Sequence, residues 1–118
     1  MIDWGNINKV RIHNRNEKMM HFIIKAMCLK LLFNAGFQVY TEKKIGNKIA
    51  DVFALKRVGK FEKEFTVIEI ETKPTKKHVR DLLVYYSVRN YNLYIIDVRE
   101  IPNELNKMQD FLEHVLGL

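Results

Sequence analysis

The chain has little of what binds zinc, forms disulfides or crosses a membrane. It holds a single cysteine, Cys28, which excludes an intramolecular disulfide, and it has no HxH or CxxC pair that would indicate a zinc cluster. Its most apolar run, residues 19–33, is broken by one histidine and two lysines and is shorter than the roughly 18 uninterrupted apolar residues of a membrane span. No signal peptide is evident. These absences predict an intracellular, cytoplasmic protein in a reducing compartment.

Repeats, low-complexity tracts and linkers are also absent, so the 118 residues predict one domain, 1–118, with an N-terminal arm over residues 1–14. Positive charge, in contrast, is abundant and uneven. The net charge is +6, and residues 1–80 hold 17 lysines and arginines against 8 acids. This asymmetry favours a polyanionic partner, and nucleic acid is favoured over an acidic membrane because no basic amphipathic helix stands alone.

Hydrophobic periodicity predicts an α/β fold in which a small mixed sheet is flanked by helices. The first helix is expected to be mostly buried, and the last strand is expected to be covered on both faces. Three successive strands favour an antiparallel meander, whereas a crossover helix makes the third and fourth strands parallel. The expected elements are a helix over 17–35, strands over 37–41, over 49–56 and from Phe65, a helix after Thr75, a strand over 91–98 and a helix from Pro102.

The stretch FTVIEIETKPTKK, residues 65–77, carries the chemistry. In an extended strand Glu69, Glu71 and Lys73 would share one face, while Ile68 and Ile70 point to the other. Two acids among isoleucines are either solvated on an exposed face or held together by a cation, because close carboxylates repel one another.

Further acids and a histidine extend this pattern. Asp51, in KIADVFAL, is a third acid inside an apolar strand, and together these three acids predict a metal site. Glu17 begins the first helix, where it is either part of that site or only an acid favoured by the helix dipole. His21 is interpreted as a partly exposed residue and not as a ligand, because no second histidine follows at helical spacing. Asp97 is interpreted as a strand-end or helix-cap residue.

This ordered set resembles the PD-(D/E)xK nuclease superfamily, which has the restriction-endonuclease-like fold, and the archaeal Holliday junction resolvases are the nearest members in layout. The resemblance covers roughly residues 14–98. It implies that Asp51, Glu69 and Glu71 bind Mg²⁺, with Mn²⁺ as an alternative, and that Glu17 completes the site or orients water. It also implies that Lys73 stabilises charge in the transition state.

One departure leaves two registers open. With Val67-Ile68-Glu69-Ile70 as the usual apolar lead-in, Glu71 takes the place of the motif lysine and the motif reads ExE. With Glu71-Thr72-Lys73 as the motif, ExK is intact but lies two residues later. We favour the first register, because it keeps Asp51 and Glu69 at the apolar centres of neighbouring strands.

The sequence therefore predicts a Mg²⁺-dependent endonuclease that acts on branched or duplex DNA, with no membrane partner, and that forms a homodimer. The alternative is a nucleic-acid-binding module on the same fold whose catalytic set has decayed, and a third class is an assembly protein whose acids form salt bridges. Whether the substrate is DNA or RNA is left open. Phosphate contacts are expected from the basic hairpin loop and from the helix after Pro74, with Lys43, Lys44, Lys48, Lys76, Lys77 and Arg80 as the residues involved.

Overall fold

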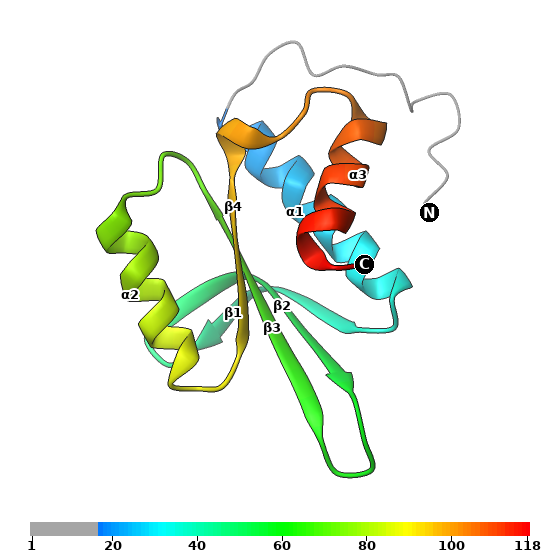
Figure 1. Ribbon diagram of the computed structural model, residues 1–118, viewed down its shortest axis with the longest axis vertical. Helices are drawn as coiled ribbons and strands as arrows, with labels where there is room; N and C mark the ends of the chain where they lie inside the picture. The colour runs from blue at the N-terminus through cyan, green and yellow to red at the C-terminus, as the bar shows by residue number, and fades with distance from the viewer. Residues whose placement is uncertain (1–16) are drawn as a thin grey trace.

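The computed structural model describes residues 17–118, which form a four-stranded mixed sheet with helices on both faces (Figure 1). The predicted order of helix, three strands, helix, strand and helix is confirmed. The predicted arm over residues 1–14 lies outside the described residues. In chain order the elements are α1 (Glu17–Asn34), β1 (Gln38–Ile45), β2 (Lys48–Arg57), β3 (Lys63–Glu71), α2 (Lys76–Ser87), β4 (Asn92–Asp97), the 3-10 turn η2 (Val98–Glu100) and α3 (Leu105–Leu116).

The strands lie in the order β1-β2-β3-β4. The first two neighbouring pairs are antiparallel and the third pair is parallel, as predicted. A two-residue turn, Gly46-Asn47, joins β1 to β2, and Gly46 takes a φ of 62° that a side chain would disfavour. Because the turn is so short, Lys43, Lys44 and Lys48 lie in the strands, and the expectation that they form a loop is wrong.

Two hydrophobic cores lie on opposite faces of the sheet, and alternation along β3 feeds both of them. Helices α1 and α3 cover one core, to which the strands contribute Val52, Ala54, Ile68, Ile70 and Ile96. Helix α2 covers the other core, where its Leu82 and Tyr86 meet Ala50, Phe53 and Val67. Glu69 stands between Ile68 and Ile70 and therefore shares the α2 face with Val67.

Predictions of burial and of one helix start need correction. The strand β4 packs against both cores as expected, but it is less buried than predicted, because it forms an edge of the sheet and only its Ile96 is fully buried. Helix α3 begins at Leu105 and not at Pro102, since the η2 turn and an extended Glu104 come first. The expectation that α1 is mostly buried is incomplete, because it leaves Phe22 and Phe33 exposed.

Cys28 is fully buried, and Gly36 follows the end of the first helix with a φ of 93°. The prediction for Asp97 is confirmed. Asp97 caps the η2 turn, where its carboxylate accepts a hydrogen bond of 2.9 Å from the backbone N–H of Arg99. No described helix is long enough and apolar enough to cross a membrane.

Candidate active site

A break in strand pairing positions Asp51. The β1–β2 pairing passes from Thr41 opposite Val52 to Lys43 opposite Ala50, which leaves Glu42 and Asp51 outside the regular pairs. The register is the same on both sides of this gap, so no residue is inserted, but Ala50 and Val52, two positions apart, lie in different cores. Asp51 is thus turned out of the regular alternation at the centre of the sheet.

The Asp51 carboxylate replaces the missing strand pairing. The β2–β3 ladder ends at Val52 opposite Ile68, and one residue further the Asp51 Oδ2 accepts a hydrogen bond of 2.7 Å from the backbone N–H of Ile70. The other oxygen, Oδ1, lies 3.4 Å from the Nε2 of His21 on α1. Two partners therefore fix this carboxylate, and its side chain remains 18% exposed.

Glu69 is the buried acid of the site. Its residue is only 7% exposed, and the hydroxyl of the fully buried Tyr86 donates to its Oε1 at 3.4 Å. Burial, and after it the nearby charge of Asp51, together raise the pKa of Glu69 from 4.5 to about 7. This carboxyl group therefore changes its protonation state near neutral pH, where general acid–base chemistry operates.

Glu71, the last residue of β3, pairs with α2. Its Oε1 lies 2.8 Å from the Nε2 of His78. The cap of α2 explains this placement: Thr75 Oγ1 accepts from the backbone N–H of His78 at 3.1 Å and fixes the first helical turn above the strand end. Glu69 and Glu71 thus both turn toward α2, which confirms that these two acids share one strand face.

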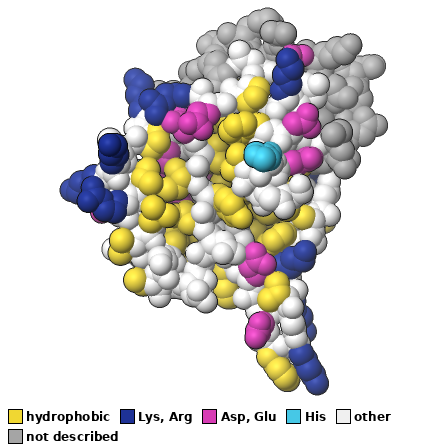
Figure 2. All heavy atoms as spheres, in the orientation of Figure 1, with side chains coloured by type: hydrophobic (Ala, Val, Ile, Leu, Met, Phe, Trp, Pro, Cys, Tyr) yellow, Lys and Arg dark blue, Asp and Glu magenta, His cyan; other side chains and the backbone are white. Residues whose placement is uncertain are grey.

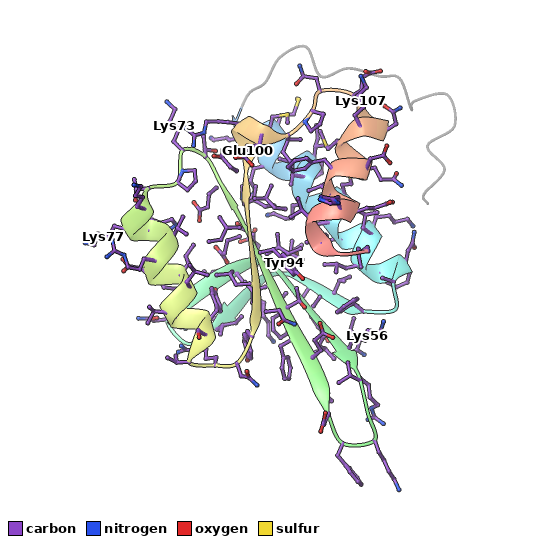
Figure 3. The ribbon with its side chains drawn as sticks, viewed as in Figure 1. Lys56, Lys73, Lys77, Tyr94, Glu100 and Lys107 are labelled. Atoms are coloured by element: carbon purple, nitrogen blue, oxygen red, sulfur yellow. The ribbon has the colours of Figure 1, made fainter. Side chains whose placement is uncertain are left out.

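Lys73 does not share that face. Strand β3 ends at Glu71, and Lys73 lies exposed in the following loop with a φ of 54° (Figure 3). The expectation that it extends the strand is wrong. The left-handed backbone conformation there is unfavourable for a residue with a side chain. Of the two registers, the ExE register keeps its motif residues inside the strand, with Glu71 in the lysine position.

Glu17 and His21 lie one helical turn apart near the start of α1. Glu17 is the first residue of the helix, and its side chain lies outside the described part of the structure. His21 was predicted to be a partly exposed helix residue, which is confirmed, but its contact with Asp51 was missed. The spacing from Glu17 was the available signal, because residues four apart share a helix face.

The predicted DNA-binding residues lie on three elements, β1, β2 and α2. Lys43 Nζ stands 5.5 Å from the ring centroid of Tyr40, and Lys48 Nζ stands 5.3 Å from that of Tyr85. Lys44, together with the three cations of α2, is exposed. Figure 2 shows Lys and Arg side chains gathered beside acidic ones over the α2 side of this view, and Figure 3 shows Lys77 pointing away from α2. The three cations of α2 are Lys76, Lys77 and Arg80.

The donor set has the chemistry of a hard-cation site without being a complete cage. Over residues 17–118, no three His, Cys, Asp or Glu side chains are arranged to hold a metal ion together. Asp51 and Glu69 nevertheless interact electrostatically on neighbouring central strands. Magnesium takes one or two protein carboxylates and keeps several waters, so two oxygen donors are compatible with it.

Comparisons of the chain with protein family models, with curated proteins and with solved structures found no match. The fold and the site thus define a small α/β protein whose central strands carry a pair of interacting carboxylates.

Proposed function

We propose that the protein is a metal-dependent endonuclease of the restriction-endonuclease-like type that hydrolyses phosphodiester bonds in DNA. The observation that carries the proposal is the carboxylate pair: Asp51 at a break in β2 and the buried Glu69 on β3 raise each other's energy when both are ionised. Close pairs of titratable acids in a fold are typical of catalytic sites. Basic side chains around them fit an anionic substrate.

The residues present fit a magnesium ion. Asp51 and Glu69 would hold it, because a divalent cation beside both carboxylates would offset the cost of burying the ionised Glu69 and its repulsion by Asp51. Glu71 supplies a further carboxylate on the same face. The bound ion would supply positive charge beside the phosphate and make water more acidic.

The remaining side chains of the site have roles of their own. The backbone N–H of Ile70 and the imidazole of His21 hold Asp51 in one orientation. Glu71 stands where the resemblance would place a lysine, and the Nε2 of His78 lies 2.8 Å from its carboxylate and holds it in place. The cations Lys76 and Lys77, close after the end of β3, would neutralise phosphates and fix the position of the substrate.

The alternative function is a nucleic-acid-binding module whose catalytic set has decayed. Two observations favour it: Lys73 lies beyond the strand, and Glu71 stands where a lysine is expected and is already paired with His78. Both functions need the same basic surface, so metal-dependent cleavage separates them. The homodimer remains a prediction. Analytical ultracentrifugation of the purified protein, which measures its mass in solution, tests it.

The test compares cleavage of four-way junction, flap, nicked and linear duplex DNA with Mg²⁺ and with EDTA. We expect cleavage that depends on the metal, and we expect Asp51→Asn to lower its rate more than about 100-fold, since even the partners of metal ligands are worth roughly 10- to 100-fold. DNA binding should persist in this variant. Asp81→Asn, the same change at an exposed position of α2, is the matched control.

Two outcomes would contradict this proposal. A wild-type protein that binds DNA but does not cut it with Mg²⁺ or Mn²⁺ would support the binding module. If the Asp51→Asn variant still cuts DNA, the carboxylate pair is not required for cleavage, whatever the substrate.

A further inference from the structure

The connection between β2 and β3 is a second feature that the carboxylate site does not explain. Residues 58–62 join the two strands in a hairpin that extends away from both helical layers (Figure 1). Phe61 at its end is 89% exposed, more than any other large apolar side chain that the structure describes. Val58 beside it is 54% exposed. A bare phenylalanine at the tip of a projecting hairpin contributes nothing to either core.

The hairpin also carries unbalanced positive charge. Arg57 and Lys63 lie directly opposite each other in the β2–β3 ladder, and like charges in such a pair destabilise a sheet. Neither side chain forms an ion pair with any residue in the described range 17–118. Lys60 Nζ, near the tip, stands 5.5 Å from the ring centroid of Phe61. An anion bound between Arg57 and Lys63 would offset the repulsion between their positive charges, so the pair can serve as a binding site for an anion.

A hollow at the base of the hairpin has room for such an anion. Its volume is about 310 Å³. Lys56 is anchored there, because its Nζ donates to the carbonyl oxygen of Ala35 at 3.1 Å, and Figure 3 shows it where the hairpin leaves the body. The site is therefore built from one hydrogen-bonded cation and two exposed cations around a space larger than a phosphate group. The lining residues are Gly36, Gln38, Leu55, Lys56, Arg57 and Lys63.

We propose that this hairpin is a nucleic-acid contact in which the cations at its base hold backbone phosphates and the Phe61 ring stacks on an unpaired base. The proposal rests on the proposed function for the choice of DNA as the nucleic acid. It narrows the substrate to DNA that contains unpaired bases. Phenylalanine stacks on any base without reading sequence. Recognition by the hairpin thus selects structure, such as a gap or a junction.

Geometry separates this contact from the chemistry. Glu69 follows Phe61 by eight positions, which at about 3.3 Å per residue places the tip roughly 25 Å from the carboxylates. That length corresponds to about seven base pairs of duplex. We therefore expect cleavage several nucleotides away from the stacked base.

An anionic membrane is the other surface that an aromatic and basic tip can meet. The charge at the tip argues against it, because Lys60 and Glu62 on either side of Phe61 cancel and leave no net positive charge to attract anionic lipid. The strongest group of cations also lies at the base of the hairpin and not at its tip. A phosphate backbone that runs along the hairpin fits this distribution better.

The experiment measures binding in EDTA, so that it is independent of cleavage. The probe is a gapped duplex with 2-aminopurine in the gap, and its fully paired counterpart is the comparison. We expect wild type to prefer the gapped probe and to quench its fluorescence. Phe61→Ala should lose the quenching and weaken binding by about 5- to 150-fold. Phe61→Trp should retain both, and Val58→Ala, the matched control, should behave as wild type.

A second measurement tests the base of the hairpin. Substituting Arg57 and Lys63 together by serine should lower the slope of log affinity against log salt by about 1.4 to 1.8, depending on strandedness. An unchanged slope would overturn the phosphate contact.

The stacking contact is overturned if Phe61→Ala binds and quenches as wild type does. It is also overturned if the substitution abolishes binding to vesicles of phosphatidylserine and leaves DNA binding intact. Cleavage with Mg²⁺ by a Phe61→Ala variant that binds DNA normally would refute the hairpin contact alone. A wild-type protein that binds the gapped and the fully paired probe equally well would also refute the hairpin contact, whether or not it cuts DNA.

Discussion

Replacing Glu69 by glutamine should stabilise the protein at neutral and alkaline pH and leave its stability unchanged at acidic pH. Glu69 is 7% exposed and lies near the Asp51 carboxylate, so its ionised form is unfavourable in the folded state. A folded pKa of about 7 against an ordinary 4.5 corresponds to a cost on the order of 3 kcal/mol once the group is fully ionised. Glutamine fills nearly the same space without a charge.

The pH window follows from the direction of the shift. Below about pH 4.5 Glu69 is protonated in both states, so the wild type has no cost. Between pH 4.5 and about 7 the unfolded chain releases the proton while the folded chain keeps it, and the contribution of Glu69 to the free energy of unfolding falls. Above pH 7 the cost is complete and constant. The variant lacks this contribution throughout the range.

Urea unfolding of both proteins from pH 4 to pH 8, without divalent metal, measures the effect. The two curves should coincide near pH 4, and the variant should be more stable by about 3 kcal/mol at pH 8, equivalent to roughly 10 °C in Tm. Glu62→Gln, the same substitution at an exposed hairpin position, should change stability by less than about 0.5 kcal/mol at every pH. A Glu69→Gln variant that follows wild type at pH 8 would refute the argument that ionised Glu69 is costly.

Two further substitutions test the register of the motif and the β1–β2 turn. Glu71→Lys should keep or increase cleavage if Glu71 stands in the lysine position, and a variant that binds DNA but no longer cuts it would instead make Glu71 a main ligand. Gly46→Ala should lower the free energy of unfolding by more than about 1 kcal/mol, because residue 46 has a φ of 62° and the added Cβ would collide with the hydroxyl of Tyr85. Gly59→Ala, whose Cβ meets Glu62 at an ordinary 3.8 Å, is its control in the same denaturation assay, and equal effects of the two substitutions would contradict the account.

Hydrophobic period and turn chemistry predicted the order of the elements because each leaves a local signal. Thr75, for example, marked the start of α2, where its side chain caps the first turn. Strand order leaves no such signal. The apolar run around Ile96 therefore predicted a fully buried strand, although β4 is an edge strand whose other side chains are only partly buried or exposed.

The candidate site was predictable to the extent that it depends on neighbouring strands. Asp51 and Glu69 were expected together because the meander places their strands side by side. The contacts of His21 and His78 were not, because they depend on how α1 and α2 are rotated over the sheet and on the break in pairing at Asp51. Lys73 was wrongly placed in the strand, because β3 ends two residues earlier, at Glu71, and the hydrophobic periodicity of the sequence does not mark that end.

The proposed endonuclease activity depends most directly on whether Asp51 and Glu69 bind a divalent ion. Adding substoichiometric Mn²⁺ to the isotope-labelled protein and recording backbone amide signals tests this without DNA. Paramagnetic broadening should be strongest at Asp51, Ile70 and the residues beside them, and excess Mg²⁺ should reverse it. The broadening should vanish in Asp51→Asn and persist in Asp81→Asn. Broadening that is absent from this site in wild type, or unchanged in Asp51→Asn, would contradict the metal site.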